Sequence, residues 1–506
     1  MAIVFIGFMG AGKTTAARHV AAVRGRRPVD TDALIEARLG HSIAEEFSRR
    51  GEAGFRALEE EVVIGALARA DPADALSLGG GSVLSPLVRD ALEGHTVVLI
   101  DVDVQTAWRR ASGRRGRPLA GDRRAFVALH AARVPVYERL ARAIVPASGR
   151  ADPARMLAAI DSLGRAPKGA RLLWATSASG DYPVLIGPGL LGADVWPVSG
   201  SRRFAITDEH VGPLYLGRLG RVAGRIVIPA GEASKTLASA EVVWRELARQ
   251  GVARDDHVVG LGGGVVGDLA GFCAATYQRG VPIVHVPTTL VAQVDSAYGG
   301  KTGVDLPEAK NYVGAYHQPA GVVVDTDTLD TLPAEELAAG YAEVVKTGLI
   351  AGGELWRRIA RGDPIDGETV TACARVKLGV VAEDERDGGR RQVLNLGHTV
   401  GHAIESATGY RRYRHGEAVG LGLLAALRLS GRDGLRREVS ELLRAQGLPV
   451  RMEDVDPAAV VAATARDKKR TGGVVPFVLV DRPGEVRTGV AVGAGELEAA
   501  VRELSA

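Results

Sequence analysis

Four residues in the second half of the chain are candidate zinc ligands. His398 and His402 lie one helical turn apart in "LNLGHTVGHAIE", so both could face one ion, although the glutamate of an HExxH motif is missing. His415 in "HGEAVG" and Glu343 in "YAEVVK" are further candidates, since two histidines and a carboxylate make an accepted catalytic zinc site. A single helical histidine is more often structural than ligating. Spacing favours His398 with His402, but the residues alone do not decide which histidines bind metal.

A phosphate-binding loop is indicated near the N-terminus. "GFMGAGKT", Gly7 to Thr14, fits GxxxxGKT between a strand pattern and a helical pattern, and a plain glycine-rich turn is the weaker alternative. Lys13 would reach the terminal phosphates of a nucleotide, and Thr14 could bind Mg²⁺. In the "VDTD" that follows, Asp30 could support the magnesium and Asp32 could accept a hydrogen bond from a substrate hydroxyl. Asp32 could equally be only a helix N-cap.

Anion-binding groups accompany this loop. Arg56 in "GFRALE" is a candidate anion clamp, and Gly79 to Gly81 in "LSLGGGSV" would let a ligand approach the backbone. The basic stretch 109–124 resembles a nucleic-acid patch, but it contains no interleaved aromatic residues. Within a nucleotide-binding unit, an arginine lid over ATP is the favoured interpretation, with a plain solvated loop as the alternative.

Lysine is scarce in this chain and is concentrated in motifs. Of the 63 basic residues only nine are lysine, and 54 are arginine. Lysine should persist where a pocket is fitted to a compact ammonium. Eight of the nine lie in candidate motifs, and only Lys168 does not. One further motif, "GLGGGVVGDLAGF", follows a strand and could admit a pyrophosphate at Gly262 to Asp268, although an ordinary tight turn is about as probable.

The elements that must position these residues form an α/β pattern with three parts. Residues 1–163 alternate buried strands such as "IVFIGF" and "TVVLIDV" with helical patterns, which predicts a doubly wound parallel sheet. A linker is predicted at 164–171, where "GRAPKGA" has linker composition. A second α/β pattern covers 172–332, and 333–506 is predominantly helical with one short strand, "PFVLVD".

Composition limits the classes of function. With 506 residues, 46% hydrophobic and 24% charged, the chain is typical of a globular α/β protein with two or three domains. A net charge of +3 and 5% aromatic residues argue against nucleic-acid or membrane partners, and favour small-molecule substrates. Two distant cysteines, no signal peptide and no apolar run long enough to span a bilayer predict a cytoplasmic protein.

The motifs of residues 1–163 resemble those of shikimate kinase, a P-loop NTPase fold. The combination of GxxxxGKT with "DTD", "FR", "GGG", "RPL" and "RVPVY" carries the resemblance. It implies phosphoryl transfer from Mg²⁺-bound ATP to a ring hydroxyl of shikimate, with Lys13, Asp32 and lid residue Arg117 catalytic. ATP and magnesium would be bound by Gly10, Gly12, Lys13, Thr14, Thr15, Asp30 and Arg117, and shikimate by Asp32, Arg56, Gly79, Gly80, Gly81 and Arg133.

The motifs of residues 175–506 resemble those of 3-dehydroquinate synthase, with a Rossmann-like NAD lobe and a helical metal-binding lobe. The resemblance implies that Glu343, His398 and His415 bind Zn²⁺, or Co²⁺, and that His402 contacts substrate. NAD would be bound by Glu232, Lys235, Gly264, Val265, Val266, Gly267, Asp268, Thr288, Thr289, Lys301, Lys310, Thr328, Leu329, Asp330 and Thr331. The catalytic and substrate-binding set would be Lys301, Lys346, Lys377, Arg391, Asn395, His402, Arg279, Asn311, Lys468 and Lys469.

This resemblance implies cyclisation of 3-deoxy-D-arabino-heptulosonate 7-phosphate to 3-dehydroquinate and phosphate. NAD would oxidise a ring alcohol and later return the hydride, so it would act as a catalyst. A homodimer formed through the synthase part is expected, with Arg279 acting across its interface. Together the two resemblances predict a fused bifunctional enzyme of the shikimate pathway. Two alternatives are a related sugar-phosphate cyclase in the C-terminal part and a non-catalytic ATP-binding regulator in the N-terminal part.

Overall fold

The chain forms two compact units, and the division between them falls inside a strand. Unit 1 contains Met1–Trp174 with Ala193–Val195, and unit 2 contains Ala175–Gly192 with Trp196–Ala506. The computed structural model describes residues 1–112, 122–147, 152–470 and 476–505, with only the backbone described for 465–470. The linker predicted at 164–171 and the lobe border predicted at 332 stay predictions.

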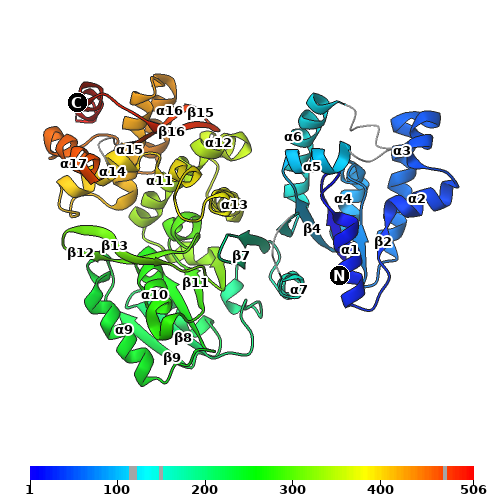
Figure 1. Ribbon diagram of the computed structural model, residues 1–506, viewed down its shortest axis with the longest axis horizontal. Coiled ribbons are helices and arrows are strands. Elements are labelled where there is room, and N and C mark those ends of the chain that lie inside the picture. The colour runs from blue at the N-terminus through cyan, green and yellow to red at the C-terminus, as the bar shows by residue number, and fades with distance from the viewer. Residues whose placement is uncertain (113–121, 148–151, 471–475, 506) are drawn as a thin grey trace. The chain divides into compact units, whose positions relative to one another are not determined.

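Unit 1 is an α/β fold around a parallel sheet. Its strand order is β2-β3-β1-β4-β5-β6, so the fully buried β1 lies between β3 and β4, with Ile3 opposite both Ala75 and Thr96. The blue and cyan part of Figure 1 shows these elements, and the doubly wound sheet expected from the sequence is confirmed. The elements are β1 (Ile3–Ile6), α1 (Lys13–Val23), β2 (Val29–Asp30), α2 (Thr31–Leu39), α3 (Ile43–Ala68), β3 (Ala75–Ser77), α4 (Pro86–Leu92), β4 (Thr96–Asp101), α5 (Val104–Ser112), α6 (Arg123–Leu140), β5 (Ala143–Pro146), α7 (Pro153–Ser162) and β6 (Arg171–Thr176).

Unit 2 begins with its own set of parallel strands, the second sheet. The strand order is β7-β14-β11-β10-β8-β9, and β10, buried along its whole length, lies between β11 and β8. Branched aliphatic side chains dominate these strands, as expected where helices cover a parallel sheet. The elements are β7 (Asp181–Gly187), β8 (Arg203–Asp208), α8 (Gly212–Tyr215), β9 (Gly224–Ile228), α9 (Leu237–Arg249), β10 (His257–Gly262), α10 (Gly264–Thr276), β11 (Ile283–Pro287) and β14 (Gly321–Asp325).

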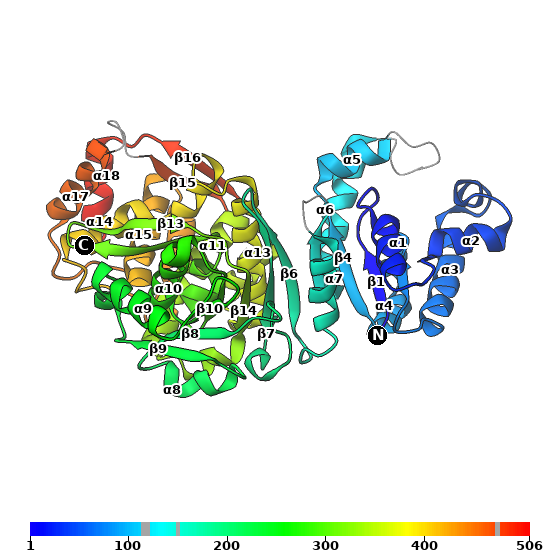
Figure 2. The same ribbon diagram turned by 60° about the horizontal axis from the view of Figure 1, so that its bottom comes forward.

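The rest of unit 2 consists of the antiparallel hairpin β12–β13, which packs against α10, and a helical lobe that contains a second antiparallel hairpin, β15–β16. Figure 1 shows the helices as a yellow to red group beside the green sheet, and Figure 2 shows the hairpin β15–β16 among them. The sequence predicted β15 but not β16, and it did not predict the hairpin β12–β13. The elements are β12 (Lys301–Leu306), β13 (Ala309–Tyr316), α11 (Ala334–Ala351), α12 (Gly353–Ala360), α13 (Gly367–Glu383), α14 (His398–Ala407), α15 (His415–Leu429), α16 (Asp433–Ala445), α17 (Pro457–Arg470), β15 (Phe477–Arg482), β16 (Glu485–Val490) and α18 (Ala494–Arg502).

Glycines allow the central helices of this lobe to approach one another closely. A Cβ atom added to Gly422 on α15 would lie 1.9 Å from the carbonyl oxygen of Gly397, the residue before α14. A Cβ atom added to Gly416 would lie 1.9 Å from the carbonyl oxygen of Ala339 on α11. The starts of α14 and α15 are therefore held near α11 by backbone contacts that no larger residue permits. None of the helices described is both long and apolar enough to cross a bilayer.

Replacing Gly422 by alanine should destabilise the helical lobe. The new methyl group would collide with the Gly397 carbonyl, and overpacking of this kind costs about 1–3 kcal/mol. The matched control is Gly420→Ala on the same helix, where the nearest atom to the new Cβ is Leu443 Cδ1 at 3.4 Å. There the alanine should be neutral or stabilising by up to about 1 kcal/mol, because alanine favours the helix. Calorimetric melting temperatures of both variants test the difference; equal melting would contradict it.

Candidate active sites

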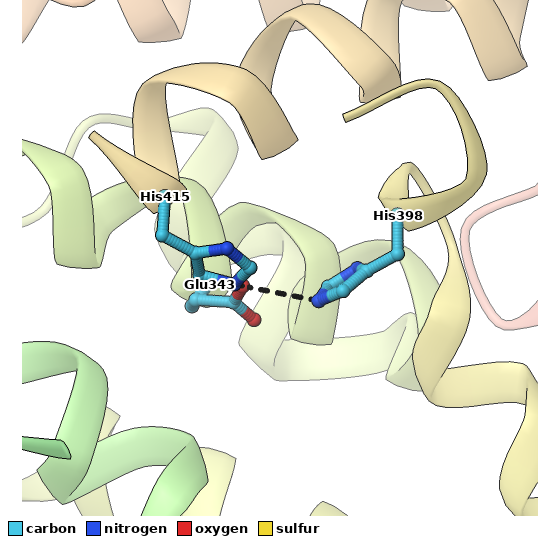
Figure 3. Close-up of side chains that lie close together, drawn as sticks. All are labelled: Glu343, His398 and His415. Atoms are coloured by element: carbon cyan, nitrogen blue, oxygen red, sulfur yellow. Dashed lines mark ion pairs between the residues drawn. The ribbon is translucent and has the colours of Figure 1, made fainter. Parts of the chain in front are cut away.

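Three helix segments bring Glu343, His398 and His415 together in unit 2. Glu343 lies in the middle of α11, His398 is the first residue of α14 and His415 the first of α15 (Figure 3). The nearest carboxylate oxygen, Glu343 Oε1, is 3.7 Å from His398 Nε2 and 3.5 Å from His415 Nε2. Ligands of a tetrahedral zinc lie roughly 3.3–3.5 Å apart, given bond lengths of about 2.0–2.2 Å. One ion therefore fits among the three side chains with little movement.

The electrostatics of this cluster favour a cation. Glu343 is 1% exposed, and neither of its carboxylate oxygens has a hydrogen bond of good geometry among the described residues. Burial alone would raise the pKa of Glu343, but Lys346 and the two imidazoles lower it well below its ordinary value. Burial and the charge of Lys346 lower the pKa of His398 to about 3, so its ring is neutral and can ligate. Burial opposes protonation of His415, yet Glu343 and Glu405 raise its pKa to about 10.

His402 lies beside this cluster, with its ring centre 5.2 Å from that of His398. It is exposed, whereas Glu343 is buried. His402 and His415 also approach Glu405 closely enough to form a second, overlapping set of metal-ligand types. The pair favoured by spacing, His398 with His402, is thus not the set that the carboxylate of Glu343 joins. Glu343, His398 and His415, the set implied by the family resemblance, do lie together.

Two buried lysines share one aspartate next to the metal-ligand cluster. Lys346, 1% exposed, lies 2.5 Å from Glu343 Oε2 and 3.9 Å from Asp295 Oδ1. Lys377 donates to the same Asp295 oxygen at 2.7 Å. Burial together with the neighbouring positive charge of Lys346 lowers the pKa of Lys377, while Asp295 opposes the shift. Burial would also lower the pKa of Lys346, but Asp295 and Glu343 raise it. This arrangement concentrates positive charge where an anionic ligand could bind.

The residues predicted to bind NAD gather at one edge of the second sheet. β14, β11 and β10 are adjacent parallel strands, so the segments that follow them meet at their carboxyl ends. Those segments are the start of α10 (Gly264, Val265, Val266, Gly267, Asp268), Thr288 with Thr289, and the 3₁₀ turn Thr326–Thr331 that contains Thr328, Leu329, Asp330 and Thr331. The hydroxyl of Thr288 is buried and without a hydrogen bond among the described residues, whereas that of Thr328 already bonds Gln293 and Asp325.

Two lysines among the candidate NAD-binding residues, Lys235 and Lys310, lie in a cluster of acids. Lys235 is 2.9 Å from Glu232, 3.4 Å from Asp268 and 3.7 Å from Asp305. Burial would lower the pKa of Lys235, but these carboxylates raise it above its ordinary value. Burial raises the pKa of Asp268 to about 6 against the pull of Lys235. Lys310, on β13, lies 3.5 Å from Glu232 and so joins the same network.

The remaining candidate anion residues have varied surroundings. Arg391 is 2% exposed and donates to the backbone carbonyls of Gly299 and Glu385, which hold its guanidinium in place. Lys301 pairs with Asp387 at 2.5 Å. Asn311, Asn395 and Arg279 are exposed, and Arg279 has a positive φ of 66°. Lys468 and Lys469 fall on α17, where side chains are outside the described part of the structure.

Unit 1 holds the phosphate-loop residues in one cavity. Gly10 and Gly12 have φ of 82° and 102°, and α1 starts at Lys13, whose ammonium donates to the carbonyls of Gly7 and Phe8 at 2.9 and 3.2 Å. Thr14 donates to Asp30 Oδ2 at 2.8 Å, so the two candidate magnesium ligands are adjacent. Thr15 lines the same cavity of about 1170 Å³. Arg117 lies outside the described residues.

The candidate shikimate residues line this cavity too. A Cβ atom at Gly79 would lie 2.8 Å from Asp32 Oδ1, and one at Gly81 would lie 2.1 Å from Arg56 Nη1, so both glycines let these side chains lie close to the backbone. Arg133 is 5% exposed and its buried Nε has no partner among the described residues. Gly80, which follows Gly79, accepts a hydrogen bond from Tyr137. Asp32 is also in the first turn of α2, but the N-cap is Asp30.

Several charged residues of these sites were not predicted from the sequence. They are the buried acids that hold the predicted cations: Glu59 against Arg56, Asp295 against Lys377, and Glu405 against Lys310. Glu59 ends the motif "GFRALE" and Glu405 ends "LNLGHTVGHAIE", but nothing in these motifs identifies the cation that each acid holds. The scarcity of lysine was the one usable signal, since a buried ammonium requires a carboxylate close by.

The two units match different known families. Residues 9–163 match the family "Shikimate kinase", residues 225–339 match "3-dehydroquinate synthase N-terminal", and residues 340–470 match "3-dehydroquinate synthase C-terminal". The 3-dehydroquinate synthase of Symbiobacterium thermophilum is 47% identical over 333 residues, which cover 60% of this chain and 92% of that protein. The 3-dehydroquinate synthase of Methylococcus capsulatus is 46% identical over 341 residues, covering 63% and 95%.

Among solved structures, one similar chain is ValA, the 2-epi-5-epi-valiolone synthase of Streptomyces hygroscopicus, determined with NAD⁺ and Zn²⁺ bound. Its TM-score is 0.59 at 29% sequence identity, covering 65% of this chain and 99% of that chain. A 2-deoxy-scyllo-inosose synthase, 24% identical with a TM-score of 0.58, shares the fold.

Removing the carboxylate between the two buried lysines should destabilise unit 2. In Asp295→Asn, Lys346 and Lys377 lose a shared counter-charge, and uncompensated buried charges of this kind cost about 3–5 kcal/mol. The lysine pKa values in the folded variant should fall, so the unfolded state binds more protons. Its free energy of unfolding should therefore rise as pH increases toward the ordinary lysine pKa of about 10.4.

Urea unfolding at pH 7 and pH 9.5 measures both effects. The control is Asp387→Asn, which breaks the pair with the half-exposed Lys301 and should cost at most about 1 kcal/mol. Equal losses in the two variants, or a loss in Asp295→Asn that does not shrink with pH, would contradict the proposed charge balance.

Proposed function

Since the chain belongs to the 3-dehydroquinate synthase family and carries a shikimate kinase unit at residues 9–163, we propose that one polypeptide catalyses two reactions of the shikimate pathway. The kinase phosphorylates shikimate to shikimate 3-phosphate with ATP. The synthase converts 3-deoxy-D-arabino-heptulosonate 7-phosphate to 3-dehydroquinate and phosphate. The two reactions are not consecutive, so the fusion does not imply transfer of an intermediate between the sites.

The convergence of Glu343, His398 and His415 is the observation that carries the synthase assignment. These residues would hold Zn²⁺ or Co²⁺, because a buried carboxylate with no hydrogen bond of good geometry among the described residues and a neutral imidazole fit a divalent ion. When bound, the ion would polarise a substrate oxygen and NAD would accept and return a hydride. Identity of 47% to a 3-dehydroquinate synthase, against 29% to ValA, favours this substrate over those of related sugar-phosphate cyclases.

The protein's own residues would bind and orient the anionic substrate beside this ion. Lys346 and Lys377 supply buried positive charge, and the lowered pKa of Lys377 suits it to exchange a proton. His402, which is exposed beside the metal-ligand set, would contact substrate. Arg391, Asn395, Lys301, Asn311 and the lysines Lys468 and Lys469 complete the proposed anion-binding set.

NAD would bind at the carboxyl edge of the second sheet. The start of α10 would receive the pyrophosphate, because helix N-termini favour anions, and the close-packed glycines there leave the backbone accessible. Glu232, Lys235 and Lys310, which form one charged network, would contact the rest of the cofactor, with Thr288 and the 3₁₀ turn Thr326–Thr331.

In the kinase unit the phosphate loop would bind ATP, and other residues of the same cavity would bind shikimate. Lys13 would bind the terminal phosphates of ATP, and Thr14 with Asp30 would hold Mg²⁺. Arg56, Arg133 and the backbone at Gly79 to Gly81 would position shikimate, with its hydroxyl against Asp32. Asp32 would orient or deprotonate that hydroxyl, which speaks for a catalytic unit and not only a nucleotide-binding regulator.

Cellular context follows from the proposed chemistry. Both activities use small, polar metabolites, and we assign the protein to the cytoplasm. We also propose a homodimer formed through unit 2. Its support is Arg279, which is exposed in one copy and belongs to the anion-binding set expected of the family.

Two single substitutions should separate the activities in the full-length chain. Asp32→Asn should lower shikimate-dependent ADP formation about 10²–10⁴-fold, the usual contribution of a general base, without changing phosphate release from the heptulosonate phosphate. Glu343→Gln should do the reverse, because it removes a metal ligand from the other unit. Each variant is the control for the other, and loss of both activities in either one would contradict independent sites.

Chelation offers a second test on the unmodified enzyme. Phosphate release with NAD present should be lost to a zinc chelator and restored by added Zn²⁺ or Co²⁺, because the ion would polarise the reacting oxygen. Kinase activity, assayed with excess Mg²⁺ after the chelator is removed, should be unchanged. Phosphate release that persists in protein shown by elemental analysis to be metal-free would overturn the metal-dependent assignment.

A further inference from the structure

Glu405 is a buried acid on α14 that the proposed reaction does not use. It is 2% exposed, and its two carboxylate oxygens have different partners. Glu405 Oε2 lies 3.5 Å from His415 Nδ1, and Oε1 accepts a hydrogen bond from Lys310 at 3.3 Å. The side chain therefore joins a candidate metal ligand to a residue of the β12–β13 hairpin.

His415 presents its two ring nitrogens to two different carboxylates. Nε2 lies 3.5 Å from Glu343 Oε1, on the side where the ion would bind, and Nδ1 lies 3.5 Å from Glu405. A neutral imidazole that gives its Nε2 lone pair to a metal keeps its proton on Nδ1. A carboxylate that accepts this proton fixes the orientation of the ring and makes it a better donor to the metal.

We propose that Glu405 is a positioning residue that holds His415 in the orientation and tautomer needed for metal binding. The proposal rests on the proposed function, because it needs an ion on Glu343, His398 and His415. Lys310 supports it by fixing the carboxylate from the other side: its ammonium also lies 3.5 Å from Glu232 and 4.6 Å from the ring centre of Tyr410. With Oε1 held in this way, Oε2 remains directed at His415.

A direct metal-ligand role for Glu405 is the competing interpretation. His402, Glu405 and His415 also lie within ligand distance of one another. Binding of an ion there would use Nδ1 of His415, so beside the ion that the proposed function places on Nε2 it would be a second ion per chain. The positioning role requires one. The number of bound ions therefore distinguishes the two roles.

The test is metal binding to the full-length chain, stripped by chelation and titrated with Zn²⁺ against a chromophoric chelator. Glu405→Ala should weaken zinc binding about 10–100-fold, the usual effect of removing a partner of a ligating histidine, at an unchanged stoichiometry of one. Glu405→Gln should weaken it less, because the amide oxygen can still accept the Nδ1 proton. The absorption spectrum of the Co²⁺ form should change in Glu405→Ala and less in Glu405→Gln.

The matched control is Glu438→Ala on α16, a partly buried glutamate that belongs to neither metal-ligand set. Its zinc affinity should equal that of the unaltered chain. If Glu405→Ala does not fold, the nearly isosteric Glu405→Gln decides alone, and zinc affinity equal to that of the unaltered chain overturns the proposal. Two ions in the unaltered chain with one lost in Glu405→Ala would make Glu405 a ligand instead. If the unaltered chain binds no zinc, the metal-dependent function itself fails.

Discussion

A buried carboxylate with no good hydrogen bond in the described part of the chain dictates much of the architecture of unit 2. Glu343 is 1% exposed in the middle of α11, and an isolated charge there would cost several kcal/mol. The structure compensates it with Lys346 on the same helix and with imidazoles that begin two further helices. Those helices can reach it only because Gly416 and Gly422 permit backbone contact. The close packing of these helices therefore also brings together the groups that compensate the charge of Glu343.

The two units assemble candidate ligand-binding residues in the same way, at the carboxyl ends of parallel strands. In each, adjacent parallel strands end at one edge, so short segments that are distant in sequence come together there. In unit 1 the segments after β1 and β3 supply the phosphate loop and the glycines opposite Asp32 and Arg56. In unit 2 the segments after β10, β11 and β14 supply the NAD edge. The metal-ligand cluster departs from this rule, since its residues come from helices alone.

Sequence reasoning succeeded where a pattern is local and failed where packing chooses the partner. Strands such as Ile3–Ile6 and the phosphate loop are encoded in consecutive residues. The predictions of parallel strands and of family membership, which rest on such local patterns, are both confirmed. The hairpin β12–β13 was missed because the glycines and polar residues of "KTGVDL" and "AKNYVGAY" interrupt any run of apolar residues. Helical spacing favoured His398 with His402, whereas the packing of α15 brings His415 to Glu343.

The boundary between the units has a practical consequence for dissecting them. β6 (Arg171–Thr176) pairs with β5 through Leu172 and Leu173, and unit 1 also includes Ala193–Val195. A kinase fragment cut in the linker-like stretch before residue 171 would lose that cover and leave β5 as an open edge strand. Unpaired edges of hydrophobic strands promote aggregation through intermolecular pairing. If such a fragment is insoluble, the cause would be the interrupted sheet, and the result would not show that the kinase is inactive.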